Sequence, residues 1–300
     1  MIIKYKVPFK YIFRKIWVVL LLVVVFSSLS YILSIYFELL VIPVGIPAFL
    51  GTAISLVLGF RLAQSYDRWW ESRKVWGSIV NDSRTLVIQL LNFSKGETSN
   101  DKRSVVERIA LRQIGWCYSL GQSLRKQNAT ENLGSLISTE EFDSLERNNN
   151  IPLALVNKHA KDIAKLHFDS DLNDYQHIQL SKTLEKLVDA MGMAERIKST
   201  IFPITYRIYL HLFIYIFLGL LSISLAEIGG VWQILIVTLI SLPFLLLERL
   251  AYLMQDPFEN RPTDTAVTTI ARTIEINIRQ LLDNIEVPLP LEPEEDYYLL

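Results

Sequence analysis

The chain has 300 residues, of which 51% are apolar and 20% are charged, and Lys plus Arg (30) nearly balance Asp plus Glu (31). The apolar fraction indicates that part of the chain lies in a lipid bilayer, and the balanced charge gives no indication of a nucleic-acid partner. The single cysteine, Cys117, excludes an intrachain disulfide framework and a metal site built from cysteines, and we expect it to be a small core residue.

Four apolar segments are long enough to cross a membrane, and they form two pairs at opposite ends of the sequence. The first pair covers Ile16 to Phe37 and Leu39 to Phe60, and the second covers Ile201 to Ala226 and Val231 to Leu247. A cleavable signal peptide is the alternative for the first segment, but its apolar run is longer than usual and no small-residue cleavage site follows. The sequence therefore predicts an integral membrane protein with four spanning helices.

Basic residues are confined to one side of these pairs. Five Lys and Arg residues precede the first segment, none lies between Ile16 and Phe60, and Arg61 begins another basic cluster. The second pair repeats the pattern, with Lys198 before it and Arg249 after it. Since Lys and Arg near span ends mark the cytoplasmic side, we expect both termini and the long central segment in the cytoplasm.

The segment from Arg61 to Thr200 and the segment after the fourth span have helical periodicity. Apolar residues recur at steps of three or four, and each stretch is expected to bury one face. The three clearest stretches are Val106, Ala110, Ile114, Cys117, Leu120 and Leu124; Leu184, Leu187, Val188, Met191 and Ala194; and Val267, Ile270, Ile274, Ile278 and Leu281. The fold class is therefore predicted to be all-α, with a cytoplasmic helical bundle joined to the spanning helices.

Two local patterns indicate where helices begin. The C-terminal tail shows no helical pattern. Ser138 and Glu141 have the spacing of a capping box, and an Asn-rich run before Ile151 indicates the start of another helix. The tail from Val287 to Leu300 is rich in Pro and acids and has no apolar stripe. We expect it to be disordered or to lie over a partner.

The sequence contains no recognisable motif of catalytic or metal-binding side chains. The four histidines, which are His159, His167, His177 and His211, have neither the spacing nor the carboxylate neighbours of a zinc site. There is no Gly-rich phosphate loop and no nucleophile elbow, so we expect no enzymatic activity and no cofactor. Arg207 and His211 lie within the third apolar segment. We expect Arg207 to reach the interface and His211 to be satisfied by a neighbouring helix, with a functional intramembrane site as the alternative.

The second apolar segment continues without a turn signal into charged sequence. Thr52, Leu56 and Phe60 are spaced by four and share one face of this helix, while Gly51 and Gly59 leave room for close helix approach. Apolar residues at this spacing are typical of a core or a lipid-facing surface. If several copies surrounded a symmetry axis, however, the same face would form stacked collars, and apolar collars gate ions by dewetting.

Several motifs resemble the bestrophin family, in particular its bacterial branch. They are Leu58-Gly59-Phe60, Asp67-Arg68-Trp69-Trp70-Glu71, Pro203-Ile204-Thr205-Tyr206 and Gln255-Asp256-Pro257-Phe258-Glu259-Asn260. The resemblance covers almost the whole chain and implies a homopentameric ion channel of the bacterial inner membrane, with a central pore and a cytoplasmic vestibule. The implied organisation is an N-terminal arm and two spans in residues 1–60, a cytoplasmic helical region in 61–200, two spans in 201–250, and a cytoplasmic helix and tail in 251–300.

The resemblance also implies roles for individual residues. It places the pore neck on Thr52, Leu56 and Phe60, and the anchoring of the neck helix on Arg68, Trp69 and Trp70. Because family necks are mostly Ile or Phe, Thr52 would make the first ring a weaker barrier. A second, cytoplasmic constriction is implied near Tyr175 to Ile178, where an apolar ring favours Ile178.

Animal members of the family bind calcium at a run of acids after the Pro-Phe pair. Asp256 and Asp264 are the candidates for a cation site here, but Arg261 interrupts the acids. Calcium needs several oxygen ligands, so we do not expect calcium gating. We expect Asp264 instead to favour the N-terminus of the helix that follows.

The predicted function is passive conduction of monovalent ions through a homo-oligomeric pore. An apolar neck carries no charge that selects a sign. Eukaryotic members conduct chloride and part of the bacterial branch is cation-selective, so we expect anions, chloride in particular, with a monovalent-cation channel as the alternative. A secondary transporter, which would show repeated broken helices and a polar midplane site, and a non-conducting scaffold are the remaining alternatives.

Overall fold

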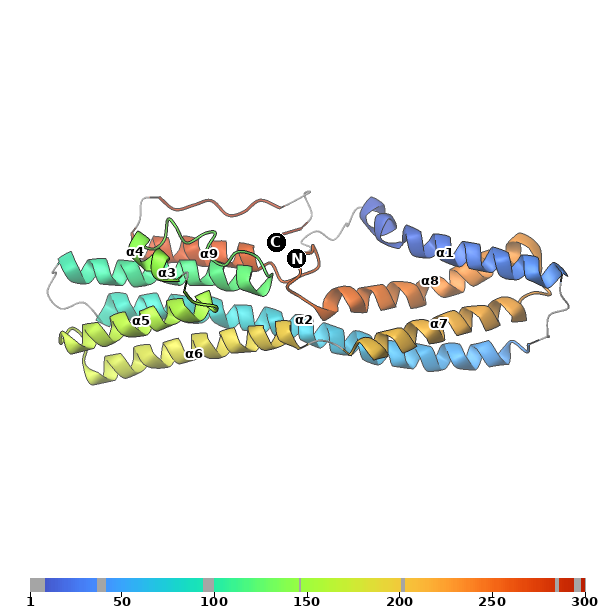
Figure 1. Ribbon diagram of the computed structural model, residues 1–300, viewed down its shortest axis with the longest axis horizontal. Coiled ribbons are helices and arrows are strands. Elements are labelled where there is room, and N and C mark those ends of the chain that lie inside the picture. Colours follow the sequence, from blue (N-terminus) through green and yellow to red (C-terminus); the bar gives the residue numbers. More distant parts are fainter. Residues whose placement is uncertain are drawn as a thin grey trace. The chain divides into compact units, whose positions relative to one another are not determined.

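A computed structural model describes residues 9–36, 42–93, 100–145, 147–200, 203–283, 286–293 and 298–299. All elements longer than one residue in these ranges are helices (Figure 1), which confirms the predicted all-α class. They are α1 (Phe9–Tyr36), α2 (Gly45–Phe93), α3 (Asn100–Leu124), α4 (Thr139–Leu145), α5 (Ile151–Phe168), α6 (Asp174–Ser199), α7 (Ile204–Ser224), α8 (Gly230–Gln255) and α9 (Val267–Leu281).

The helices form two compact units. The apolar unit contains α1, α2 as far as Trp69, α7, and α8 with the following residue, Asp256. The polar unit contains α2 from Trp70 onward, α3 to α6, and the chain from Pro257 onward, including α9. Helix α2 therefore contributes side chains to both units.

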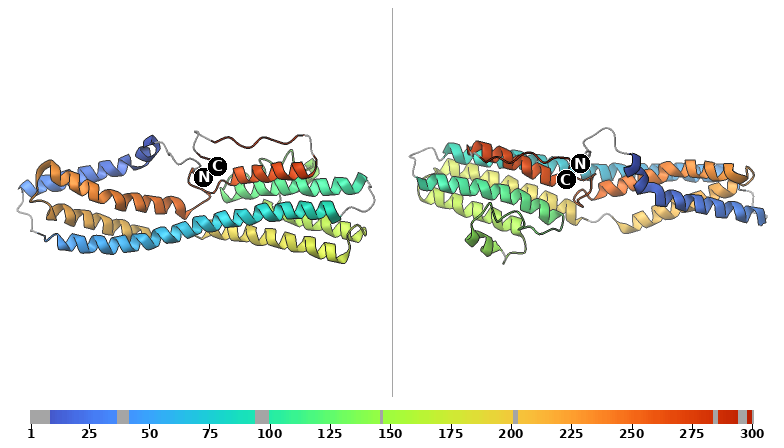
Figure 2. Two further views of the ribbon diagram at one scale, coloured as in Figure 1. Left: turned by 180° about the vertical axis from the view of Figure 1, so that it is seen from behind. Right: turned by 90° about the horizontal axis from the view of Figure 1, so that it is seen from above.

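The apolar unit has a small core of its own. Helix α1 packs against α7 and α8, which also pack against each other (Figures 1 and 2). Ile54 of α2 belongs to the same buried cluster as Ile214 and Phe217 of α7. A Cβ at Gly51 would lie 3.0 Å from the Phe217 ring, so the expected close approach occurs there. At Gly59 nothing lies within 4 Å of such a Cβ, and the expectation is wrong for contacts within this chain.

Three helices in the described part of the chain are long and apolar enough to cross a membrane: α2, α7 and α8. The apolar stretch of α1 is shorter and covers Trp17–Leu33. Phe37, Leu39 and Ile201, which bound three of the predicted spans, lie outside the described residues.

The turn between α7 and α8 depends on two glycines. Gly229 has a φ of 67° and Gly230 a φ of 58°, both in the left-handed region that a side chain disfavours. The turn joins the second pair of apolar helices at the place where the sequence predicted a loop without basic residues.

The polar unit is a bundle around α3, which packs against α5, α6 and α9 (Figure 2). All six residues of the predicted stripe on α3 are buried, as are four of the five on α6, where Val188 is partly buried. On α9, Val267, Ile274 and Ile278 are buried and Ile270 is partly buried, but Leu281 is exposed. The stripe therefore predicted the buried faces correctly except at Leu281, where the helix ends.

Cys117 is a core residue, as predicted. Its side chain is fully buried on α3 between Ser83 and Gln113. Burial raises the pKa of the Cys117 thiol to about 12, and hydrogen bonds from Ser83 and Gln113 only partly oppose this shift. The thiol is therefore protonated and unreactive at neutral pH.

The predicted boundaries before α4 and α5 are present, but one capping box is half formed. Ser138 Oγ accepts a hydrogen bond from the Glu141 amide at 3.3 Å, whereas the Glu141 carboxylate binds Arg112 instead of closing the box. Helix α5 begins at Ile151, and Asn150 caps it by accepting from a first-turn amide. The interaction with Arg112 joins α3 to α4, which a local sequence pattern does not reveal.

The described parts of the tail, residues 286–293 and 298–299, are not helical. Leu291, Glu292 and Leu299 line a cavity in the polar unit. These three residues therefore lie beside the polar unit of their own chain, and contact of the tail with a partner stays a prediction.

Candidate pore-lining site

Most of α2 between Gly51 and Phe60 is exposed, and only Gly51, Ile54 and Leu58 are buried in this stretch. Leu56 is 63% exposed and Phe60 is 62% exposed, and Thr52 is exposed one turn earlier. These are the three residues predicted for the neck, and the helical spacing of four places them along one line. No charged side chain belongs to this line.

The opposite face of α2 is held by α7. Ile54 and Leu58 are buried, and Gly51 allows the Phe217 ring to approach closely. The Tyr206 hydroxyl donates to the Val57 carbonyl at 3.1 Å, which fixes the start of α7 against the middle of this segment. The exposed line is thus the unpacked side of a helix whose other side is fixed.

Thr52 differs from its two partners because it carries a hydroxyl. This hydroxyl donates to the Ala48 carbonyl of the preceding turn at 3.0 Å. Because the hydroxyl proton is donated within the helix, only the lone pairs of the hydroxyl oxygen remain as a polar group on the exposed line. Thr52 is therefore less apolar than Leu56 and Phe60, but it carries no unsatisfied donor.

A buried ionic cluster follows the exposed line directly in the sequence. Arg61 is fully buried, and its Nη1 lies 3.2 Å from Oε1 of Glu248 on α8. His211 of α7 places Nε2 3.4 Å from Oε2 of the same carboxylate. The cluster joins three helices through charged groups, which tolerate burial only when they are paired. The sequence showed Arg61 and Glu248 as the first charges beyond two apolar runs, but gave no sign that they meet.

The prediction for His211 is confirmed. In addition to the contact with Glu248, His211 Nδ1 lies 2.9 Å from the Arg207 carbonyl, so both ring nitrogens have partners. The guanidinium of Arg207 lies 5.3 Å from the centroid of the Tyr252 ring, and that of Arg249 lies at the same distance. Arg207 is thus held by a cation–π contact, which favours a guanidinium over an aromatic face.

The residues predicted to anchor the neck helix have different surroundings. Arg68 Nε donates to the carbonyl of Gln255, the last residue of α8, at 2.9 Å. This bond satisfies a carbonyl at a helix C-terminus, where a cation is favoured. Trp69 is partly buried, with its ring centroid 6.0 Å from that of Tyr66, and Trp70 is 45% exposed. The anchoring role of the two tryptophans stays a prediction.

Ile178, the residue predicted for a second constriction, lies in the polar unit on α6. Its side chain is 51% exposed, and Tyr175 one turn earlier is also exposed. The apolar stripe of α6 begins with Leu180 on another side of the helix. Ile178 is thus available for contacts outside this chain.

The two aspartates predicted as a candidate cation site belong to different units, Asp256 to the apolar unit and Asp264 to the polar unit. Asp264 is buried, and its Oδ2 accepts from the amides of Glu259 at 2.7 Å and Arg261 at 3.0 Å. The carboxylate of Asp264 thus organises the loop before α9, and its expected favourable effect on the N-terminus of that helix stays a prediction. In the described residues, no cluster of three or more His, Cys, Asp or Glu side chains could hold a metal.

The polar unit contains a second buried charge cluster. Arg112 of α3 binds Glu141 of α4, and its Nη1 lies 2.8 Å from Asp162 of α5, which also accepts from Arg108 at 3.0 Å. Burial raises the pKa of Asp162, but the hydrogen bonds from Arg108 and Arg112 outweigh it, and the net pKa is lowered. Burial and the charge of Arg112 lower the pKa of the fully buried His159 to about 3. His159 is therefore a neutral core residue.

Most of the sequence matches one family model. The model describes bacterial and fungal bestrophin proteins and matches residues 8–280. The chain belongs to the bestrophin family. The resemblance inferred from the short motifs is therefore confirmed over most of the sequence.

Relatives with assigned names and solved structures agree with this assignment. A voltage-dependent anion channel-forming protein of Nostoc sp. is 32% identical over 245 residues, 80% of this chain and 79% of the relative. One from Escherichia coli is 30% identical over 83% of this chain and 80% of the relative. The crystal structure of a bacterial bestrophin homologue from Klebsiella pneumoniae has a TM-score of 0.83 and 27% identity, covering 89% of this chain and 98% of that one. All three similarities agree with the assignment of this chain as a membrane protein of the bestrophin family.

Proposed function

We propose that this bestrophin-family protein is a homopentameric channel that passes monovalent anions, chloride in particular, through a central pore lined by α2. The observation that carries the proposal is the exposed line of Thr52, Leu56 and Phe60 on a helix whose opposite face is packed. Such a line contacts lipid, another copy or a pore. The names of the relatives as anion channel-forming proteins favour the pore.

In a ring of copies the three residues would form three collars, about 6 Å apart along the helix axis. Leu56 and Phe60 have no polar side-chain atom, so their collars would impede ions when the pore loses its water. The Thr52 collar would carry hydroxyl oxygens and form the weakest of the three barriers. The neck would therefore control whether ions pass more than which ions pass.

The proposed arrangement in the membrane follows the distribution of Lys and Arg. Each subunit would have four spanning helices, with α1 as the fourth beside α2, α7 and α8. Both termini and the polar unit would lie in the cytoplasm of a bacterial inner membrane. The exposed Ile178 of α6 would then be available to line a second, cytoplasmic constriction.

The reversal potential in asymmetric KCl tests the proposal. Purified full-length protein is incorporated into a planar bilayer with a tenfold KCl gradient, and protein-free bilayers serve as the control. We expect the reversal potential to have the sign of the chloride equilibrium potential. The opposite sign would support the monovalent-cation channel, and absence of channel currents from reconstituted protein would favour a transporter or a scaffold.

A further inference from the structure

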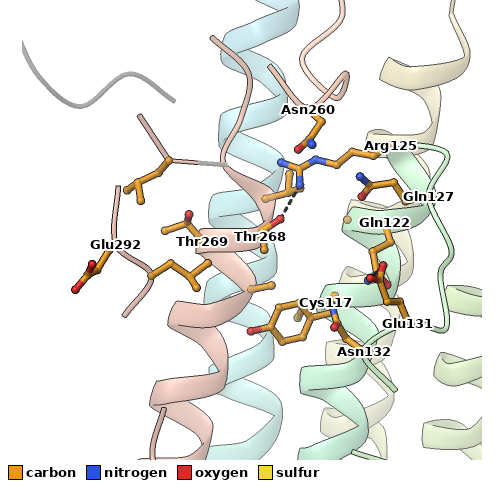
Figure 3. Close-up of a pocket in the computed structure, with 16 residues that line it drawn as sticks. Cys117, Gln122, Arg125, Gln127, Glu131, Asn132, Asn260, Thr268, Thr269 and Glu292 are labelled. Atoms are coloured by element: carbon orange, nitrogen blue, oxygen red, sulfur yellow. Dashed lines mark hydrogen bonds between the residues drawn. The ribbon is translucent and has the colours of Figure 1, made fainter. Parts of the chain in front are cut away.

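A cavity of about 290 Å³ lies in the polar unit between α3, the start of α9 and the tail (Figure 3). Small-molecule sites usually have volumes from about 300 Å³ upward, so this cavity is of the size that suits a very small metabolite. Polar side chains of α3, of the segment that follows it and of α9 form much of its wall, and Leu291, Glu292 and Leu299 of the tail complete it. None of the predicted channel residues lines it.

One end of the cavity favours a negative group. Arg125, in the turn that follows α3, donates from Nη1 to the hydroxyl of Thr268 at 2.6 Å. Thr268 and Thr269 belong to the first turn of α9, whose N-cap, Ala266, supplies no side-chain hydrogen bond. Asn260 lies beside Arg125 in Figure 3. A guanidinium next to a helix N-terminus is the combination that binds carboxylates and phosphates.

The other end favours a donor with positive charge. Gln122 lines the same cavity and is 8% exposed, and its Oε1 has no hydrogen-bond partner. Its Nε2 lies 3.5 Å from the carboxylate of Glu131. Because that carboxylate can only accept, the amide nitrogen must face it, which leaves Oε1 as the atom that lacks a donor. A buried acceptor without a donor costs free energy, and a ligand N–H would remove this cost.

We infer that the cavity binds a small zwitterion of the free amino acid class. Its carboxylate would lie at Arg125 and the first turn of α9, and its ammonium at Gln122 and Glu131. Gln122 and Arg125 are three residues apart, about 4.5 Å along a helix axis, so one small molecule reaches both. Leu291 and Leu299 line the remaining wall, which suits a short apolar side chain. The site goes beyond the proposed channel function and does not depend on it.

Calorimetric titration of the full-length protein in detergent tests this inference with three probes. L-alanine carries both charges, propionate carries only the carboxylate, and ethylamine carries only the ammonium. We expect saturable binding of L-alanine and binding at least about tenfold weaker for each of the other two, since each loses one set of contacts. Equal binding of propionate and L-alanine would overturn the zwitterion site, as would no saturable heat for L-alanine up to about 20 mM.

Two variants and one control connect the binding to the cavity. Arg125→Gln and Gln122→Leu should each weaken L-alanine binding by about tenfold or more, because each removes one polar end. Arg196→Gln removes an exposed arginine that pairs with Glu71 elsewhere in the polar unit and should bind L-alanine as the parent does. Thermal melting identifies any variant that fails to fold. A folded Gln122→Leu protein with unchanged affinity would overturn the inference, whatever currents the protein carries in a bilayer.

Discussion

Arg61 and Glu248 show how a single charged residue constrains the membrane part of the molecule. The guanidinium is fully buried and lies 3.2 Å from the carboxylate, which His211 also contacts. Removing two such charges from water costs several kcal/mol, and their mutual attraction offsets this cost only while both are present. The buried position of each charged side chain is therefore stabilised more by the other charge than by the apolar residues around it.

Loss of one partner should lower the free energy of unfolding more than loss of both partners does. We expect Glu248→Leu to destabilise the protein by about 3–5 kcal/mol, because it leaves a buried guanidinium without its carboxylate. The double variant Arg61→Met with Glu248→Leu should regain much of this stability, since apolar groups of similar volume replace the pair. Thermal unfolding in detergent measures both effects as shifts in Tm.

The matched control is Glu227→Leu, because Glu227 is an exposed acid in the turn between α7 and α8. It should leave the Tm nearly unchanged. If Glu248→Leu melted at the same temperature as the parent, or the double variant at a lower temperature than the single one, the pair would not have the role argued from its burial.

His159 gives the polar unit a defined dependence on pH. Its pKa is lowered from 6.5 to about 3 by burial and by Arg112, with Asp162 acting weakly in the other direction. The unfolded chain therefore takes up a proton below about pH 6.5 that the folded protein does not bind. The contribution of His159 to the free energy of unfolding is fully present above about pH 6.5. It decreases by about 1.4 kcal/mol for each pH unit below this value, until about pH 3.

This dependence can be measured from melting temperatures between pH 7.5 and pH 4.5. We expect the Tm of the parent to fall as the pH is lowered, and that of His159→Leu to fall less steeply, because leucine does not titrate. Asp162 does not account for the difference, since its lowered pKa places its titration below this window. Parallel curves for the two proteins would contradict the buried, neutral state of His159.

At the scale of elements, α2 combines a packed face with an exposed one. Leu56→Ala and Phe60→Ala should each raise single-channel conductance, because a smaller side chain would widen the apolar neck and allow it to hold water. The measurement is the unitary current in a planar bilayer. The effect should be larger in the double variant.

A matched control for these variants lies on α8. Leu239 is an exposed leucine of a helix that is not proposed to line the pore, and Leu239→Ala should leave the unitary current unchanged. Equal currents for Leu56→Ala, Phe60→Ala and the parent would instead place this face of α2 against lipid.

The sequence predicted the elements better than the contacts between them. The stripes on α3 and α6 identified buried faces because helical periodicity is local information. The Arg61–Glu248 pair could not be predicted in this way, since the two residues are 187 positions apart and lie on two different helices, α2 and α8. The same limit explains why the hydrogen bonds from the Glu259 and Arg261 amides to the Asp264 carboxylate were not predicted.

The whole molecule presents a large apolar surface that a single chain does not cover. Exposed apolar residues lie on all four helices of the apolar unit, as expected for contact with lipid and with other copies. We expect native mass spectrometry of the purified protein to show five copies of the chain. A monomer would contradict the proposed pore and favour the transporter alternative, and another number of copies would change the diameter of the proposed neck.

Cys117 makes this chain a convenient subject for chemical labelling. It is the single cysteine among 300 residues, and its buried thiol has a pKa of about 12, so maleimides and methanethiosulfonates have no accessible native target. A cysteine introduced as Thr52→Cys, Leu56→Cys or Phe60→Cys would report alone, without prior removal of other thiols. The rate at which a water-soluble reagent modifies each one would then map, ring by ring, how far water enters the neck.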